Sequence, residues 1–156
     1  MKHSNPNEET SVPFRPSAGV LLVLKSAVVL AKRIELFRGK KVPFGGYWSP
    51  FAGGLEEGEN PMTAALRELK EETGIKKSIH ELKFASNIAK KGGTFSLYII
   101  EIDDIPTIKL DEEHTEYGIF KISELDNFPG KIDPNIVKSL KDYIKRRDEG
   151  IRLSEK

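Results

Sequence analysis

The chain has 156 residues, of which 38% are hydrophobic and 31% are charged, so its length and composition suit one globular domain. The 25 Lys and Arg residues nearly balance the 24 Asp and Glu residues, which argues against nucleic-acid binding driven by bulk positive charge. Because the chain has no cysteine, disulfides, cysteine-based metal sites and thiol nucleophiles are excluded. The longest apolar stretch, residues 18–31, is interrupted by Lys25 and is shorter than the roughly 20 residues of a membrane span, so we expect a cytoplasmic protein with no membrane partner.

The first third of the chain predicts a β-hairpin. Two apolar, β-rich runs over residues 20–24 and 28–30 are separated by a short turn, which indicates a hairpin buried on both faces. Residues 37–46 are basic and contain three glycines, so they predict a loop. An aromatic cluster follows, and its Trp48 is expected to pack in the core.

The clearest predicted element is a helix over residues 61–73. Asn60 is a favourable N-cap residue, Pro61 suits the first helical position, and Gly74 suits the position just after the last turn. Apolar residues recur at spacings of three and four, so the helix is expected to bury one face. That stripe consists of Met62, Ala65, Leu66 and Leu69.

The second half of the chain predicts more strands and a closing helix. Strands are expected over residues 82–88 and 94–102, and an acidic, irregular stretch and a short strand over residues 117–122 follow them. The last helix is expected to begin at residues 133–134 and to end at Gly150. Its apolar face consists of Ile136, Val137, Leu140, Tyr143 and Ile144.

These elements predict a simple organisation. Residues 1–16 are polar and rich in proline, and we interpret them as a flexible lead-in. Residues 17–150 hold strands and helices in alternation, which indicates a single mixed α/β domain. Residues 151–156 form a short tail.

Three glutamates on the predicted helix carry the chemistry. Glu68, Glu71 and Glu72 fall within one arc of the helix surface, close to its C-terminal end. Neighbouring like charges destabilise a helix by a few tenths of a kcal/mol per pair, and the helix dipole disfavours anions at this end. Carboxylate oxygens without nearby Cys or His suit a hard cation such as Mg²⁺ or Mn²⁺. The alternative is a solvated acidic face, which many helices have.

The flanking residues favour the metal site, because they follow a specific spacing. The pattern is a glycine, a glutamate six positions later, and then Arg-Glu-Leu-x-Glu-Glu-x-Gly-Ile after seven more residues. It consists of Gly53, Glu59, Arg67, Glu68, Leu69, Glu71, Glu72, Gly74 and Ile75. This pattern resembles the Nudix box of the Nudix hydrolase family, with every defined position matched. The resemblance extends in element order over residues 18–144 and implies an α/β/α sandwich with a mixed central sheet.

The resemblance implies a pyrophosphohydrolase that uses Mg²⁺, with Mn²⁺ as an alternative, to cleave a nucleoside diphosphate linked to a second group X. By the family pattern, Glu71 and Glu72 would bind the metal, and Glu68 would bind it or act as the general base. Arg67 would orient the glutamates. Glu59 would add a ligand or pair with Arg67, and the backbone carbonyl at Gly53 could join the metal shell.

The family also often supplies a carboxylate from a later loop. Glu113 is our choice over Glu112 and Glu116, because it precedes the strand over residues 117–122 at about the family's distance. The alternative for this loop is a solvated charge cluster. Of the three histidines, only His114 is kept as a candidate for proton transfer.

Candidates for substrate contact carry a weaker signal. Arg33, Arg38 and Lys41 could meet phosphates beyond the metal, and the alternative is ordinary surface charge. Tyr98 could line the pocket; by strand alternation, it lies on the opposite face from Phe95.

The identity of X is left open by the residues. A nucleoside triphosphate or a modified nucleotide fits the small size best. Dinucleoside polyphosphates and ADP-ribose or ADP-sugars are alternatives, although the proline and the tyrosine expected for such enzymes about 16 residues after the box are both absent. Capped RNA is a third alternative. Apart from such an RNA 5′ end, we expect no nucleic-acid partner. A non-catalytic nucleotide-binding module is a remote alternative, because such a module would normally lack a glutamate of the box, and Glu68, Glu71 and Glu72 are all present here. The sequence leaves open whether the protein forms a homodimer.

Overall fold

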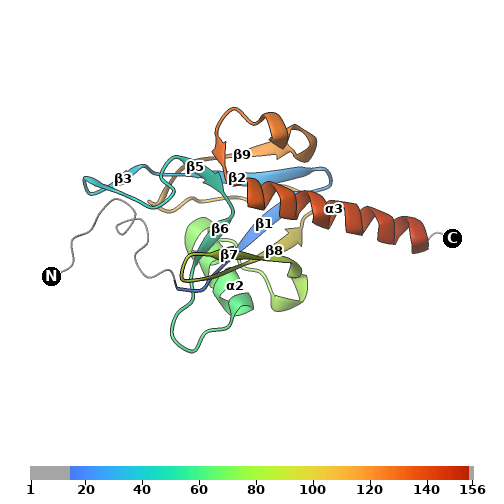
Figure 1. Cartoon of the computed structure of the whole chain (residues 1–156), viewed down its shortest axis with the longest axis horizontal. Helices are drawn as coiled ribbons and strands as arrows, with labels where there is room; N and C mark the ends of the chain where they lie inside the picture. The colour runs from blue at the N-terminus through green and yellow to red at the C-terminus, as the bar shows by residue number, and fades with distance from the viewer. Residues whose placement is uncertain (1–14, 155–156) are drawn as a thin grey trace.

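The computed structural model describes residues 15–154, with side chains through residue 151. The expected lead-in therefore lies almost wholly outside the described residues. An eight-stranded sheet forms the centre of the molecule, with one helix on each face (Figure 1). Its strands are β1 (Ser17–Leu24), β2 (Ala27–Arg33), β5 (Tyr47–Ser49), β6 (Phe51–Gly54), β7 (Lys83–Lys90), β8 (Gly93–Glu101), β9 (His114–Lys121) and β10 (Lys131–Ile132).

The strand β1 organises the sheet, and its partners make the sheet mixed. It pairs antiparallel with β2, where Leu22 lies opposite Val29, and this confirms the predicted hairpin. The first half of β1, from Ser17 to Val20, pairs antiparallel with β6, and the other edge of β1 pairs parallel with β8. The strand is almost fully buried, as a strand covered on both faces should be.

The helix α2 (Pro61–Thr73) has the predicted bounds, because its caps are encoded locally. The Asn60 side chain accepts a hydrogen bond from the Thr63 backbone N–H, and Pro61 occupies the first turn. Gly74 adopts φ +80°, the left-handed conformation that favours glycine, and its N–H donates to the Lys70 carbonyl. Leu69 and Ala65 are fully buried, and the rest of the predicted stripe packs against them.

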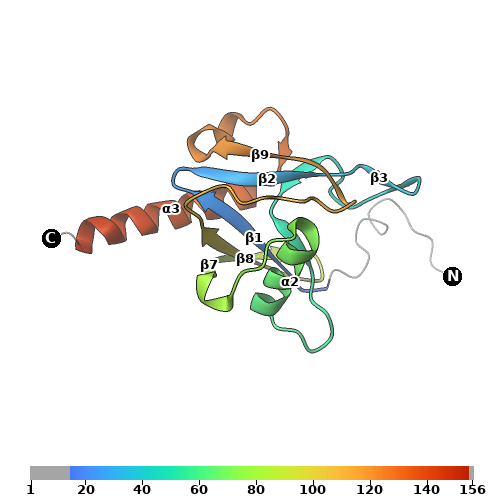
Figure 2. The ribbon, with the colours of Figure 1, turned by 180° about the vertical axis from the view of Figure 1, so that it is seen from behind.

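Two apolar cores, one on each face of the sheet, confirm the expected sandwich. The first packs α3 (Pro134–Ser154) against alternate residues of β1 and β2, and includes Phe95. The second packs α2 against the other face and includes Tyr98, so the expected alternation of these two aromatic residues is confirmed. Figure 2 shows the same arrangement from behind.

The structure corrects three expectations about element bounds. The basic loop contains a short two-stranded hairpin, β3 (Leu36–Phe37) and β4 (Lys40–Lys41). The strand β9 begins at His114, earlier than expected, because its first residues pair with the end of β2. The helix α3 continues past Gly150 to Ser154. Gly150 is exposed and keeps a helical backbone, so it lowers the stability of the helix by about 1 kcal/mol relative to alanine without ending it.

Two short 3₁₀ helices, η1 (Ile79–Glu81) and η2 (Ile122–Asn127), complete the connections. The predicted packing role of Trp48 is confirmed, because its ring meets those of Phe120 and Phe128 edge-on at 5.2 and 5.9 Å between centroids. Within the described part of the chain, neither long helix has the length and apolar character needed to cross a bilayer.

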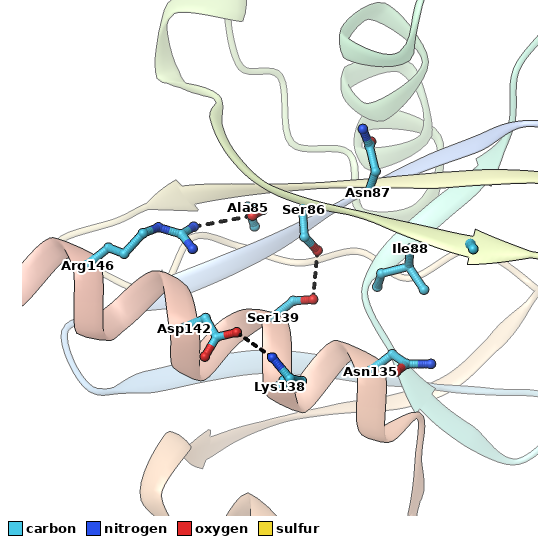
Figure 3. A pocket seen from close by; sticks show the side chains of 10 residues that line it. Ala85, Ser86, Asn87, Ile88, Asn135, Lys138, Ser139, Asp142 and Arg146 are labelled. Atoms are coloured by element: carbon cyan, nitrogen blue, oxygen red, sulfur yellow. Dashed lines mark hydrogen bonds and ion pairs between the residues drawn. The ribbon is translucent and has the colours of Figure 1, made fainter.

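A groove of about 390 Å³ lies between α3 and β7, the last strand of the sheet on that side (Figure 3). Polar contacts cross its floor: the Ser86 and Ser139 hydroxyls are hydrogen-bonded at 2.7 Å, and Arg146 donates to the Ala85 carbonyl at 3.3 Å. The groove lies on the α3 face of the sheet, whereas α2, which carries Glu68, Glu71 and Glu72, packs on the other face. It therefore takes no part in the site described next.

Candidate metal centre

Glu72, in the last turn of α2, is the most deeply buried of the predicted site residues that carry a charge. It is 2% exposed, and its Oε1 accepts a hydrogen bond from the Ala52 backbone N–H at 3.0 Å. Burial, reinforced by the nearby charges of Glu68 and Asp111, raises the pKa of Glu72 well above its usual range. A carboxylate in this position needs a positive partner to be ionised.

The end of α2 also brings a second acidic segment to Glu72. The last carbonyls of a helix have no partners inside it. Here the Lys109 N–H donates to the Thr73 carbonyl at 2.9 Å, and the Asp111 N–H donates to the Glu72 carbonyl at 3.1 Å. These two bonds fix the loop before β9 alongside the helix end and place the Asp111 side chain beside Glu72.

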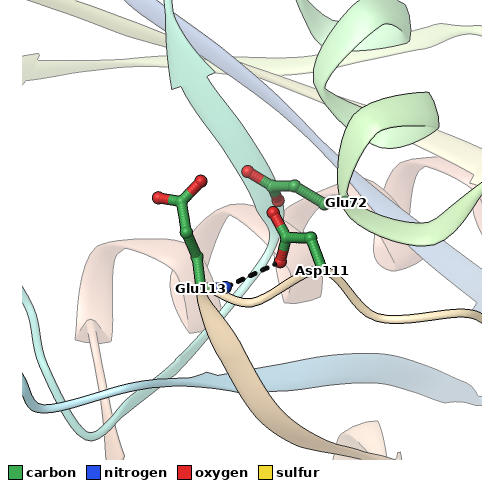
Figure 4. Close-up of side chains that lie close together, drawn as sticks. All are labelled: Glu72, Asp111 and Glu113. Carbon is green, nitrogen blue, oxygen red and sulfur yellow. Dashed lines mark hydrogen bonds between the residues drawn. The ribbon is translucent and has the colours of Figure 1, made fainter. Parts of the chain in front are cut away.

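Glu72, Asp111 and Glu113 form an acidic cluster (Figure 4). Each offers a carboxylate oxygen, and these oxygens all lie within 4.8 Å of one another. The Asp111 Oδ1 atom also accepts the Glu113 N–H at 3.2 Å, which shapes the loop so that both side chains turn toward Glu72. Three convergent carboxylates, one of them buried, fit a hard divalent cation.

The cluster includes two predicted metal ligands and one residue that sequence reasoning missed. Glu72 and Glu113 were expected, whereas Asp111 was not considered. Its only local signal is its place two residues before Glu113 in an acidic turn. Its nearness to Glu72 depends on a backbone pairing across nearly 40 residues of chain, which no local pattern reveals.

Arg67 contacts the remaining glutamates of the predicted site. Its guanidinium donates to Glu59 at 2.9 Å, to Glu68 at 2.9 Å and to the Gly54 carbonyl at 3.0 Å. The hydrogen bond from Arg67 lowers the pKa of Glu59 to about 2. Of the two roles considered for Glu59, the structure shows the pairing with Arg67.

The three helix glutamates occupy different environments. Glu71 is exposed and pairs with Arg67 at 3.1 Å, so it lies apart from the three residues of the acidic cluster. The Glu68 side chain is 13% exposed, and burial raises its pKa. A Cβ atom on Gly53 would lie 2.2 Å from the Glu68 carboxylate, so this glycine is required for the close approach. The metal-binding roles of Glu59, Glu68, Glu71 and Gly53 stay predictions.

The predicted substrate contacts are spread over two regions. Arg33 ends β2, and its guanidinium lies 3.9 Å from the Glu113 carboxylate. Arg38 and Lys41 are exposed on the β3–β4 hairpin. Tyr98 is 7% exposed and belongs to the core under α2, where its ring meets Phe84 edge-on. Its packing accounts for its burial, and its contact with substrate stays a prediction.

Comparisons with known proteins identify the family and agree with the fold. A family model described as NUDIX domain matches residues 13–143. The chain is 38% identical to an RNA pyrophosphohydrolase of Brucella anthropi over 87 residues, which are 55% of this chain and 49% of that protein. It is 42% identical to an RNA pyrophosphohydrolase of Cereibacter sphaeroides over 66 residues, which are 42% of this chain and 36% of that protein. The chain thus spans half or less of the length of these relatives.

The solved structures show the same fold. A MutT protein from Methanosarcina mazei has a TM-score of 0.67 and 20% identity, and the match covers 88% of this chain and 97% of that one. The family model covers most of the chain, including every residue of the acidic cluster. The protein therefore belongs to the NUDIX domain family.

Proposed function

We propose that the protein is a divalent-cation-dependent pyrophosphohydrolase that cleaves a nucleoside diphosphate linked to a second group, with a nucleoside triphosphate or a modified nucleotide as its substrate. The acidic cluster is the observation that carries this proposal. A buried carboxylate with two carboxylates facing it is costly to ionise unless a cation offsets the negative charge. Polyphosphate oxygens are strong ligands for the same kind of cation. A cytoplasmic location, where nucleotides are made and used, goes with this proposal.

Glu72, Asp111 and Glu113 would hold the cation, which we propose is Mg²⁺, with Mn²⁺ as a substitute. Their hard oxygen donors match both ions. When bound, the cation would offset the negative charge of the phosphate oxygens and draw electron density from the bond that breaks. Without it, the acidic cluster would repel a polyphosphate.

Glu68 would accept the proton of the attacking water. Arg67 holds its carboxylate from one side, and Gly53 leaves room for it on the other. The raised pKa of Glu68 brings it closer to the neutral range in which a general base works well. Arg67 would thus act through Glu68, as a residue that fixes the base in place.

Arg33 is the basic side chain best placed to meet the substrate, because it already lies beside Glu113. A phosphate bound at the acidic cluster would give its guanidinium a bidentate partner. Arg38 and Lys41, on the projecting hairpin, would meet a longer substrate.

An RNA 5′ end is the second candidate substrate, and the relatives favour it, because those described above are named RNA pyrophosphohydrolases. The exposed basic hairpin of this chain would suit an RNA backbone. A second basic pair, Lys90-Lys91, contributes less to such a patch, because Lys90 is paired with Asp133 at 2.7 Å.

A hydrolysis screen tests the proposal. The purified protein would be incubated with nucleoside triphosphates, oxidised nucleotides, dinucleoside polyphosphates, ADP-ribose, NADH, capped RNA and 5′-triphosphorylated RNA, with Mg²⁺ or with excess chelator. We expect Mg²⁺-dependent release of a nucleoside monophosphate or of inorganic pyrophosphate, separated by chromatography. Preference for the RNA over the matching nucleoside triphosphate would select the second candidate. Absence of cleavage across the panel, with Mg²⁺ bound, would contradict the proposal.

The Gly53→Ala variant should lower kcat by about 10-fold, because the new methyl group must displace the Glu68 carboxylate from its place beside Arg67. Its thermal stability should change little, since the displaced atoms are the end of a flexible side chain. Steady-state kinetics and a thermal melt would measure both. Gly150→Ala, with nothing within 4 Å of its new Cβ atom, is the matched control and should keep the wild-type kcat.

A further inference from the structure

His114 stands out as a buried polar side chain that the proposed mechanism does not use. Its side chain is 0% exposed, and its ring packs edge-on against Phe51 with centroids 6.0 Å apart. The Nδ1 atom lies 2.8 Å from the Asp111 Oδ1 atom. The Nε2 atom has no hydrogen-bond partner among the described residues and lies 3.8 Å from the Glu72 Oε1 atom.

The hydrogen-bond chemistry assigns the direction of the first contact. An ionised carboxylate can only accept hydrogen bonds, so Nδ1 must carry the proton and donate to Asp111. The same Asp111 oxygen also accepts the Glu113 N–H, so two donors fix it from different sides. His114 therefore determines where one carboxylate of the acidic cluster points.

The second nitrogen argues against a purely structural role. A buried nitrogen without a partner costs free energy, and a core built only for stability would favour an apolar ring of the same size. Instead, the ring lies between the two acidic side chains that come from different elements, Asp111 from the loop and Glu72 from α2. One ring nitrogen thus contacts Asp111, and the other lies close to Glu72.

We propose that His114 is a positioning residue of the acidic cluster: its Nδ1–H holds the Asp111 carboxylate, and its buried ring keeps Asp111 and Glu72 at the spacing that a divalent cation requires. Residues that orient metal ligands in this way commonly change metal affinity or activity by 10- to 100-fold when they are replaced. The consequence for catalysis rests on the proposed function, whereas the consequence for cation binding does not.

Two replacements of His114 distinguish the effect of its Nδ1–H donor from the effect of its ring volume. His114→Phe keeps a ring of similar size but has no donor, and His114→Asn keeps an amide N–H close to the Nδ1 position while it loses most of the ring. Mn²⁺ binding, measured by electron paramagnetic resonance without substrate, is the direct test. We expect His114→Phe to weaken Mn²⁺ binding by about 10-fold, and His114→Asn to recover most of that loss. The exposed His80, replaced by Asn, is the control and should bind Mn²⁺ as the wild type does.

Kinetics add a second readout that packing alone would not change. The Mg²⁺ concentration for half-maximal activity should rise in His114→Phe and return toward the wild-type value in His114→Asn, whatever the melting temperatures of the two variants. Wild-type Mn²⁺ affinity in His114→Phe, or no recovery in His114→Asn, would overturn the proposal. If the wild type binds Mn²⁺ and responds to these replacements but cleaves no substrate, the proposed function fails while the role of His114 stands.

Discussion

Replacement of Glu72 by glutamine should reduce kcat by about 100-fold or more, because the acidic cluster then loses the charge that holds a cation against the substrate. The amide has nearly the same shape, and its oxygen can still accept the Ala52 N–H. The loss should therefore appear in kcat and in the Mg²⁺ dependence while the fold is kept. Steady-state kinetics over a range of Mg²⁺ concentrations would measure it.

The same replacement should stabilise the metal-free protein at neutral and alkaline pH. The folded-state pKa of Glu72 is raised, so between the ordinary value near 4.5 and the folded value the unfolded chain is ionised while the folded chain keeps its proton. The free energy of unfolding of the wild type must then fall as pH rises through this window. Glutamine removes this loss, and we expect a gain of about 1–3 kcal/mol at pH 8 that shrinks toward pH 4.

Denaturant unfolding with chelator present, at several pH values, would test this second effect. Glu124→Gln changes an exposed carboxylate on η2 and should alter neither kcat nor the pH profile. Wild-type kcat in the Glu72→Gln variant would contradict the metal-binding role of Glu72. A stability difference that does not depend on pH would contradict the raised pKa of its carboxyl group.

Leu69→Ala should cost about 2–5 kcal/mol of unfolding free energy, which is the usual loss when a large apolar side chain is removed from a core. Leu69 is 0% exposed and belongs to the apolar core between α2 and the sheet. It is also one residue from Glu68, so the stability of this contact determines whether the site glutamates stay in place. Urea unfolding monitored by circular dichroism would measure the change.

Leu66→Ala provides the comparison, because Leu66 belongs to the same stripe but is only partly buried. Its loss should be clearly smaller than that of Leu69→Ala. Equal losses, or an unchanged melt for Leu69→Ala, would contradict the burial of the predicted helix face.

The features that could be predicted from the sequence are those encoded over a few residues. The bounds of α2 follow from Asn60 and Gly74, whose cap bonds involve neighbours three and four positions away. The hairpin of β1 and β2 follows from two apolar runs and a short turn. The box glutamates were located for the same reason, since their spacing lies within one helix.

The features that could not be predicted depend on contacts between distant segments. Helical spacing placed Glu71 and Glu72 together, yet one is exposed and the other is 2% exposed, because the sheet covers only one side of α2. Asp111 joins Glu72 through a backbone bond between a loop and a helix end. Gly150 is a residue that often ends a helix, but here it keeps a helical backbone and not the left-handed conformation of a C-terminal cap, so α3 continues past it.

The most direct test of this account is the affinity of the metal-free protein for Mn²⁺, measured for the wild type, Glu72→Gln and Asp111→Asn. The acidic cluster predicts a binding site in the wild type that weakens by at least about 10-fold in each variant, because each loses one charged ligand. Undiminished binding in both variants would place the cation elsewhere and contradict the central claim that Glu72 and Asp111 form its site.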